Sequence, residues 1–134
     1  MTSPKSEIKE FYRDKTVLIT GTTGFVGKTL LEKMIRAFPD IKRIYLLIRP
    51  RKNMTLAKRV QQQIFSTHLF EPLFLDRPDF PKWIKERVIP IEGDLVLNGL
   101  GIKPEDRKTL TEEVQIIMNS AASINFTEPL HDAL

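Results

Sequence analysis

Three glycines near the N-terminus stand at a spacing that suits the binding of a pyrophosphate. Gly21, Gly24 and Gly27 form the pattern G-x-x-G-x-x-G, a variant of the G-x-G-x-x-G dinucleotide fingerprint. The pattern follows a short apolar segment, Thr16–Ile19, and leads into a helix-like run, Lys28–Phe38. The first glycine permits a tight turn, the second lets the main chain approach phosphates, and the third lets the helix lie near the strand. A flexible loop is the alternative, but the strand–turn–helix context favours a dinucleotide at the helix N-terminus.

The residue after the second apolar segment indicates which dinucleotide is bound. Arg49 directly follows Arg43–Ile48, where an NAD-binding fold usually has Asp or Glu to bind the ribose hydroxyls. Arginine instead offers a positive charge and a planar fork of donors, which suit a 2′-phosphate. Arg59, on the next predicted helix, is placed to reach back to the same phosphate. An ordinary surface arginine is the alternative at position 49; we predict NADPH rather than NADH.

Polar and small residues follow the two remaining strand candidates, Arg87–Glu92 and Val114–Asn119. Asp94 is placed to accept a hydrogen bond from the adenine amino group, although an Asp that closes a turn is an equally good interpretation. Asn119 can bridge strand and loop, and the small residues behind it would admit the nicotinamide side of the cofactor, with a plain turn again the alternative. The predicted cofactor-binding residues are Gly21, Thr23, Gly24, Phe25, Val26, Gly27, Arg49, Arg59, Asp94, Leu95, Asn119, Ala121 and Ala122.

The four strand candidates alternate with helical patterns, as in buried parallel sheets with helical crossovers. Pro39 ends the first helix, Thr55–Ser66 is the second with Thr55 as its cap, and the third starts near Pro104. We therefore predict an α/β fold, a Rossmann-like doubly wound parallel sheet with strand order 3-2-1-4. This sheet is incomplete, so residues 1–134 read as the N-terminal portion of an NADP-binding domain. The apolar outer edge of the fourth strand is open to pairing.

A long connection, residues 50–87, separates the second and third strand candidates. It contains several prolines and five large aromatic residues: Phe65, Phe70, Phe74, Phe80 and Trp83. We interpret it as a helical insertion whose aromatic side chains pack on the sheet or on each other. A surface for a membrane or a protein partner is the alternative.

The composition is that of an ordinary globular domain. The chain has 134 residues, of which 41% are hydrophobic and 28% charged. The absence of cysteine excludes disulfides and a thiolate nucleophile and favours an intracellular protein. The N-terminus lacks a secretory signal, and the longest apolar run, Ile44–Ile48, is far too short to span a membrane. The net charge of +4 suits a phosphorylated cofactor; because basic residues alternate with acidic ones and no aromatic-studded basic stripe appears, we expect no nucleic-acid partner.

Together these motifs resemble those of the alcohol-forming fatty acyl-CoA reductases, which are extended short-chain dehydrogenase/reductases. The resemblance runs from about Phe11 to Leu134 and rests on Thr20–Lys28 with Leu30–Lys33, Ile44–Pro50, the pair Gly93-Asp94, Asn119–Phe126 and Glu128–Leu130. It implies reduction of a long-chain fatty acyl-CoA by hydride from NADPH, through an aldehyde to a primary alcohol. It also implies attachment to the endoplasmic reticulum or peroxisomal membrane through parts outside this segment. For the site, it implies that Arg49 binds the 2′-phosphate, Asp94 lies by the adenine, and Ala121 and Ala122 lie near the nicotinamide half.

The catalytic Tyr-x-x-x-Lys of that superfamily has no counterpart in these 134 residues. Thr16 stands four residues after Tyr12, and Arg49 four residues after Tyr45. The only histidines are His68 and His131, which we expect in surface loops. With no proton donor to assign, we predict that this chain supplies the cofactor-binding half and is inactive alone.

Three alternatives stay open at this stage. The chain can belong to a thioester-reductase domain, or to another extended reductase-like enzyme such as a nucleotide-sugar dehydratase. From a different class, it can be a truncated, non-catalytic product that binds NADP(H) or pairs with a full-length partner through its open strand edge.

Overall fold

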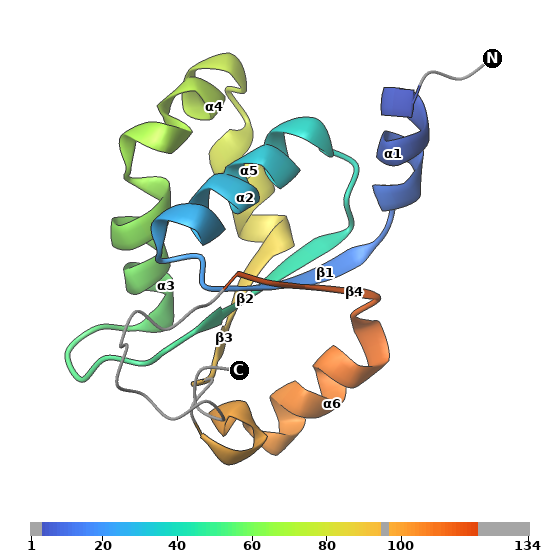
Figure 1. The fold of residues 1–134 in the computed structure, drawn as a ribbon. Helices are drawn as coiled ribbons and strands as arrows, with labels where there is room; N and C mark the ends of the chain where they lie inside the picture. The colour runs from blue at the N-terminus through green and yellow to red at the C-terminus, as the bar shows by residue number, and fades with distance from the viewer. Residues whose placement is uncertain (1–3, 95–96, 121–134) are drawn as a thin grey trace.

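A parallel sheet with helices on both faces forms the centre of the molecule (Figure 1). The computed structural model describes residues 4–94 and 97–120. Its strands are β1 (Thr16–Thr20), β2 (Arg43–Ile48), β3 (Val88–Glu92) and β4 (Ile116–Asn119). In the described part the sheet has the order β3-β2-β1-β4, and every neighbouring pair is parallel. The predicted α/β class and the order 3-2-1-4 are therefore confirmed.

The helices are divided unequally between the two faces of the sheet. One face carries α2 (Phe25–Ala37), α3 (Leu56–Val60), α4 (Glu71–Asp76) and α5 (Phe80–Arg87), and the other carries α6 (Pro104–Glu113) (Figure 1). A π-helical turn, Gln61–Phe65, continues α3, and 3-10 turns cover His68–Phe70 and Asn98–Gly101. The N-terminal helix α1 (Pro4–Tyr12) lies beside the end of α2, where the Tyr12 ring stacks on Phe38 at 4.4 Å.

Strand side chains are buried on both faces, as the continuous apolar runs predict. Val17 and Ile19 of β1 face the larger helical layer, while Leu18 between them packs toward α6 with Tyr45 and Leu47. This alternation follows from the two-residue period of a strand. Both faces of β1 are therefore buried, and the carboxyl end of the strand leads directly into the glycine turn.

The insertion packs its aromatic side chains inward. Phe70 and Phe80 are fully buried, Phe65 and Trp83 are buried, and Phe74 is half-buried against them. The phenylalanine rings meet edge to face, for example Phe65 with Phe70 at 5.0 Å between centroids, and Phe80 stacks on Trp83. The interpretation of these aromatics as core is confirmed.

Donors from the insertion bind carbonyl groups at the C-terminal end of α2 and in the loop that follows it. Arg77 Nη1 donates to the Ile35 carbonyl at 3.2 Å, and Trp83 Nε1 donates to the Pro39 carbonyl at 3.2 Å. The Arg77 guanidinium also lies 5.0 Å from the Trp83 ring centroid, a cation–π contact. The insertion thus fixes the far end of the helix whose N-terminus forms the glycine turn.

Several predicted boundaries were wrong by one or more residues. The first helix begins at Phe25 rather than Lys28, because the glycine turn itself winds into the helix. Arg87 ends α5 instead of opening β3, and the N–H group of Val114 bonds to Leu110 at the end of α6, so β4 starts only at Ile116. Thr55 caps α3 as predicted, accepting from the Lys58 N–H at 3.1 Å. Helix α1 was not predicted.

Candidate dinucleotide-binding site

The glycine turn joins β1 to α2 in a geometry that only glycine tolerates at two positions. Gly21 has φ 75°, in the left-handed region, and its carbonyl accepts from the Gly24 N–H at 3.1 Å. A Cβ at Gly27 would lie 2.0 Å from the Gly21 carbonyl oxygen and 2.7 Å from Ser120 Oγ. The close packing of helix on turn that the spacing predicted is therefore present.

The N-terminus of α2 is open to an anion. No side chain caps Gly24 in the described part of the chain, and the first turn contains no acidic residue. Phe25 and Val26 occupy that turn with 83% and 66% of their surface exposed, and Thr23 is half-buried. The first N–H groups of a helix have no partner within it, and the helix dipole favours negative charge there. The turn thus offers main-chain donors and a positive field to a pyrophosphate.

Thr22 was not among the predicted site residues. It is only 1% exposed, and its hydroxyl has no hydrogen-bond partner among the described residues. A buried hydroxyl normally forms a hydrogen bond. Thr22 therefore leaves one hydrogen-bonding group of the turn without a partner among the described residues. The sequence signal was weak, because threonine between glycines is common in turns.

Beside the turn, the carboxyl ends of β2 and β3 border a shallow, solvent-open pocket of about 160 Å³. Its lining is Arg49, Pro50, Glu92, Gly93, Asp94, Leu97 and Gly101. The structure brings Arg49 and Asp94 together here, with 4.0 Å between Arg49 Nε and Asp94 Oδ2. The Arg49 side chain is 73% exposed, so its guanidinium stands at the mouth of the pocket. An exposed guanidinium at the rim is accessible to an incoming phosphate.

Arg59 reaches back from α3 as predicted, but its observed contact is with the main chain. Its Nη1 donates to the Arg49 carbonyl, and its Nε donates to Gln63 Oε1 at 3.0 Å. The side chain is buried, and burial together with the charges of Arg51 and Arg49 lowers its pKa. No carboxylate lies within 4.0 Å of this guanidinium in the described part. A buried cation without a counter-ion is costly, and an arriving anion would offset that cost.

Hydrogen bonds connect the glycine turn to the end of β4. Thr20 Oγ1 donates to Asn119 Oδ1 at 2.5 Å, and Ser120 Oγ donates to the Thr20 carbonyl at 2.5 Å. The Asn119 bond joins the ends of two neighbouring strands, and Ser120 was not among the predicted site residues. The predicted residues Leu95, Ala121 and Ala122 lie outside the described residues.

The histidines and Tyr45, which the sequence did not favour as catalytic residues, have other surroundings where the structure describes them. Exposed His68 pairs with Glu71 at 2.8 Å, and the Tyr45 hydroxyl donates to Glu113 at the opposite end of β2. His131 lies outside the described residues. Across the ranges 4–94 and 97–120, no group of His, Cys, Asp and Glu could hold a metal ion. Over the same ranges, none of the helices combines the length and apolar character that a bilayer crossing needs.

Comparison with known proteins decides the family. Residues 19–134 match the model of an NAD-binding family described as Male sterility protein. The chain belongs to this family. The predicted resemblance to fatty acyl-CoA reductases is confirmed, since curated relatives of that name match over 127 residues. Fatty acyl-CoA reductase 1 of Pongo abelii is 39% identical and that of Homo sapiens 38%. Each match covers 95% of this chain and 24% of the relative, so the chain spans about a quarter of their length.

Solved structures extend the likeness of this Male sterility family member to the fold. The terminal R domain of the myxalamid PKS-NRPS biosynthetic pathway matches with a TM-score of 0.67 and 28% identity, over 90% of this chain and 28% of that domain. The reductase domain of a Mycobacterium tuberculosis non-ribosomal peptide synthetase matches with a TM-score of 0.64 and 27% identity, over 83% of this chain and 25% of that one. A nicotinamide dinucleotide is thus the class of cofactor that this family's fold binds, and a Rossmann-like reductase fold is the shared architecture.

Proposed function

We propose that this chain is the NADPH-binding part of an enzyme that reduces long-chain fatty acyl-CoA to primary fatty alcohol. The observation that carries the proposal is the pairing of two features at one sheet edge. An open helix N-terminus follows β1, and Arg49 with buried Arg59 follows β2. The relatives named fatty acyl-CoA reductase supply the substrate class.

In the proposed site the two features bind different parts of the cofactor. The glycine turn and the first turn of α2 would hold the pyrophosphate by main-chain N–H groups. Arg49 would bind the 2′-phosphate, and Asp94 would lie by the adenine in the neighbouring pocket. Gly27 fits this role because its missing Cβ lets the helix approach the turn. Thr23, Phe25 and Val26 line the turn; Leu95, Asn119, Ala121 and Ala122 stay predictions for the rest of the cofactor.

When bound, NADPH supplies hydride to an acyl carbon. Conversion of an acyl thioester to an alcohol consumes two hydrides and two protons and releases the thiol of coenzyme A. The superfamily's Tyr-x-x-x-Lys is not found in these 134 residues, so we propose that they bind and orient the cofactor without supplying the proton donor. The chain alone would then oxidise no NADPH in the presence of palmitoyl-CoA. Membrane attachment, at the endoplasmic reticulum or peroxisome, would depend on other parts of the enzyme.

Titration of the folded chain with NADPH and, separately, with NADH tests this function. We expect a clear preference for NADPH that Arg49→Ala abolishes while leaving NADH binding unchanged. A folded chain that prefers NADH, or binds neither dinucleotide, would contradict the proposal. Circular dichroism of both proteins supplies the folding control.

A second candidate is the reduction of a thioester on a carrier protein, and the R domains of matching fold favour it. Both candidates share the cofactor site. They differ in the group that delivers the acyl chain, so turnover of the complete enzyme with acyl-CoA and with acyl carrier protein separates them.

The edge of β4 supports a proposal about association. Among the described residues β4 pairs with β1 alone, and Ile117 on this strand is 67% exposed. We propose that a further strand, from a complete enzyme or a second copy, pairs there. Light scattering after size exclusion should show concentration-dependent association that Ile117→Lys weakens; a monomer at all concentrations, without affinity for the complete enzyme, would contradict it.

A further inference from the structure

The chain segment that carries Arg49 is strongly basic. Between Asp40 and Glu71 the chain contains seven lysines and arginines and no acidic residue. Elsewhere in the sequence basic residues alternate with acidic ones, but the charged residues of this segment are all basic. Arg51, Lys52 and Lys58 are exposed, and none forms an ion pair within the described ranges.

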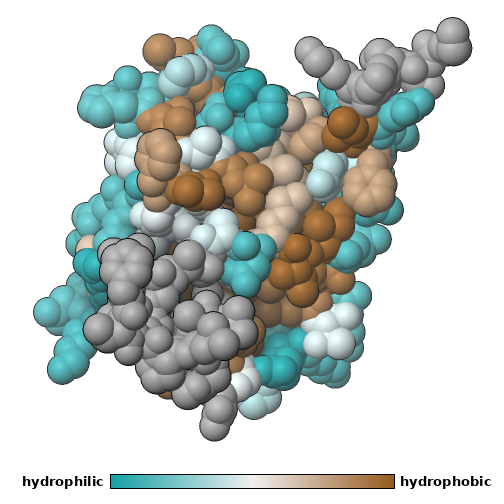
Figure 2. Space-filling view, in the orientation of Figure 1, coloured by the Kyte–Doolittle hydropathy of each residue, from teal (hydrophilic) through white to brown (hydrophobic). Residues whose placement is uncertain are grey.

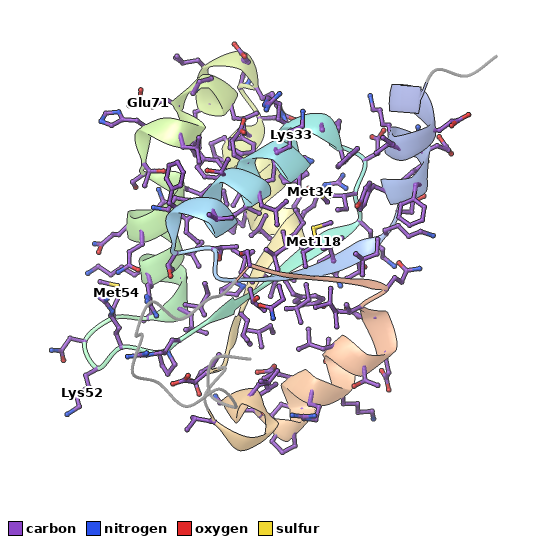
Figure 3. All side chains as sticks on the ribbon, in the orientation of Figure 1. Lys33, Met34, Lys52, Met54, Glu71 and Met118 are labelled. Atoms are coloured by element: carbon purple, nitrogen blue, oxygen red, sulfur yellow. The ribbon has the colours of Figure 1, made fainter. Side chains whose placement is uncertain are left out.

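Arg51 and Lys52 directly follow Arg49 and Pro50, which line the pocket. Arg51 and Met54 form an isolated antiparallel bridge, which turns the chain into a short hairpin between β2 and α3. Lys52 stands at the outer tip of this hairpin, well away from Lys33 on α2 (Figure 3). The hydrophilic surface of the hairpin projects from the body of the molecule in the space-filling view (Figure 2). The positive charge of Arg51 helps to lower the pKa of Arg59, so the hairpin and the buried arginine interact electrostatically.

A 2′-phosphate carries a charge of roughly −1.5 to −2 near neutral pH. Arg49 lies 4.0 Å from Asp94, and Glu92 also lines the pocket, so these two carboxylates offset part of the charge of Arg49 and Arg59. The three outer cations keep the segment positive without lining the pocket. Uncompensated charges beside a binding site act at longer range: they raise the local concentration of an oppositely charged ligand and its association rate. The effect scales with ligand charge, so it favours the 2′-phosphorylated dinucleotide over the other.

We propose that Arg51, Lys52 and Lys58 are specificity-determining residues that accelerate the capture of NADPH without contacting it. The inference rests on the proposed function and deepens it. Arg49 and Arg59 would contact the bound phosphate, whereas the outer cations would attract NADPH before it binds. Their removal therefore lowers the association rate and leaves the dissociation rate unchanged.

Stopped-flow binding to the full chain, followed by nicotinamide fluorescence, tests the proposal. The variant is Lys52→Glu with Lys58→Glu, and the matched control is Lys33→Glu with Lys85→Glu. All four lysines are exposed, and each pair lowers the net charge of +4 by the same amount. At about 20 mM salt we expect NADPH association to slow roughly tenfold in the variant and under about twofold in the control. At about 300 mM salt the difference should fall below about twofold, and NADH should respond less throughout.

Equal slowing by both pairs would assign the effect to overall charge and overturn the inference. A faster dissociation of NADPH with unchanged association would mean direct contact, which also overturns it. Failure of the unmodified chain to bind NADPH would instead reject the proposed function itself, so the two failures are distinguishable. Lys52→Gln, with an expected effect of about twofold at low salt, repeats the test with a milder change if the double variant melts early.

Discussion

The Arg59 guanidinium donates a hydrogen bond to the main-chain carbonyl of Arg49, the residue whose side chain stands at the mouth of the pocket. This contact joins α3 to the end of β2. The Arg59 side chain is buried, while that of Arg49 is exposed. The arrangement is unfavourable without an anion, because desolvation and like charges both act against the buried guanidinium. A phosphate bound beside Arg59, as we propose, would offset that cost.

Replacing Arg59 should therefore affect stability and binding in opposite directions. Arg59→Met keeps most of the side-chain volume and removes the buried charge, so we expect the free energy of unfolding without cofactor to stay within about 1 kcal/mol or rise. NADPH affinity should fall roughly tenfold, since one charge-assisted partner is lost. Urea unfolding and a binding titration measure the two effects. Unchanged NADPH affinity would show that Arg59 serves only the fold.

Gly27→Ala should disrupt the turn on which the pyrophosphate site depends. Its Cβ would lie 2.0 Å from the Gly21 carbonyl oxygen, which forces β1 and α2 apart. We expect a loss of about 2 kcal/mol or more in the free energy of unfolding and no measurable NADPH binding. Gly24→Ala is the matched control for stability alone, because its nearest contact would be 3.4 Å away and its φ is −86°. A control as damaging as Gly27→Ala would contradict the packing argument.

Trp83→Phe tests whether the insertion holds the end of α2. The change removes the hydrogen bond from the indole Nε1 to the Pro39 carbonyl, 3.2 Å long, while keeping an aromatic ring in the core. We expect a loss of about 1–3 kcal/mol in stability, since the half-buried Pro39 carbonyl loses its donor and the smaller ring packs less well. Thermal unfolding measures it, with exposed Lys85→Ala as control. Equal melting temperatures for the two variants would show that the bond from Trp83 to Pro39 does not stabilise the end of α2.

The acid dependence of stability should depend on Tyr45 and Glu113. The Tyr45 hydroxyl donates to Glu113, and this bond, with nearby Arg43, holds the pKa of that carboxyl below its ordinary value of 4.5. A depressed pKa in the folded state stabilises the protein above the unfolded-state pKa, and that contribution is lost as pH falls through the folded value. Tyr45→Phe should therefore flatten the decline in stability below about pH 4.5. Denaturant unfolding between about pH 3 and pH 7 measures it, and parallel profiles for both proteins would refute the assignment.

Much of the site could be predicted because parallel strands bring their carboxyl ends to one edge of a sheet. Once the apolar segments were recognised, Gly21, Arg49, Asp94 and Asn119 each had to follow a strand at that edge. The strand order could be inferred from the alternation of strands and helices. Helix α1 was missed although Ile8, Phe11 and Tyr12 stand at helical spacing in the sequence. Ile8 and Phe11 are 51% and 57% exposed, so this stripe contributes little to the core.

The sequence by itself determined the sheet, the glycine turn and the sign of the charge beside it, since these depend on residue type and short spacing. Only the tertiary structure decided which groups meet across long separations. Ser120 donates to Thr20, Trp83 to Pro39 and Arg77 to Ile35, over 100, 44 and 42 residues. It also decided that Arg59 is buried against the Arg49 carbonyl rather than exposed beside it. Such contacts depend on the packing of helices against a common sheet, which local pattern does not encode.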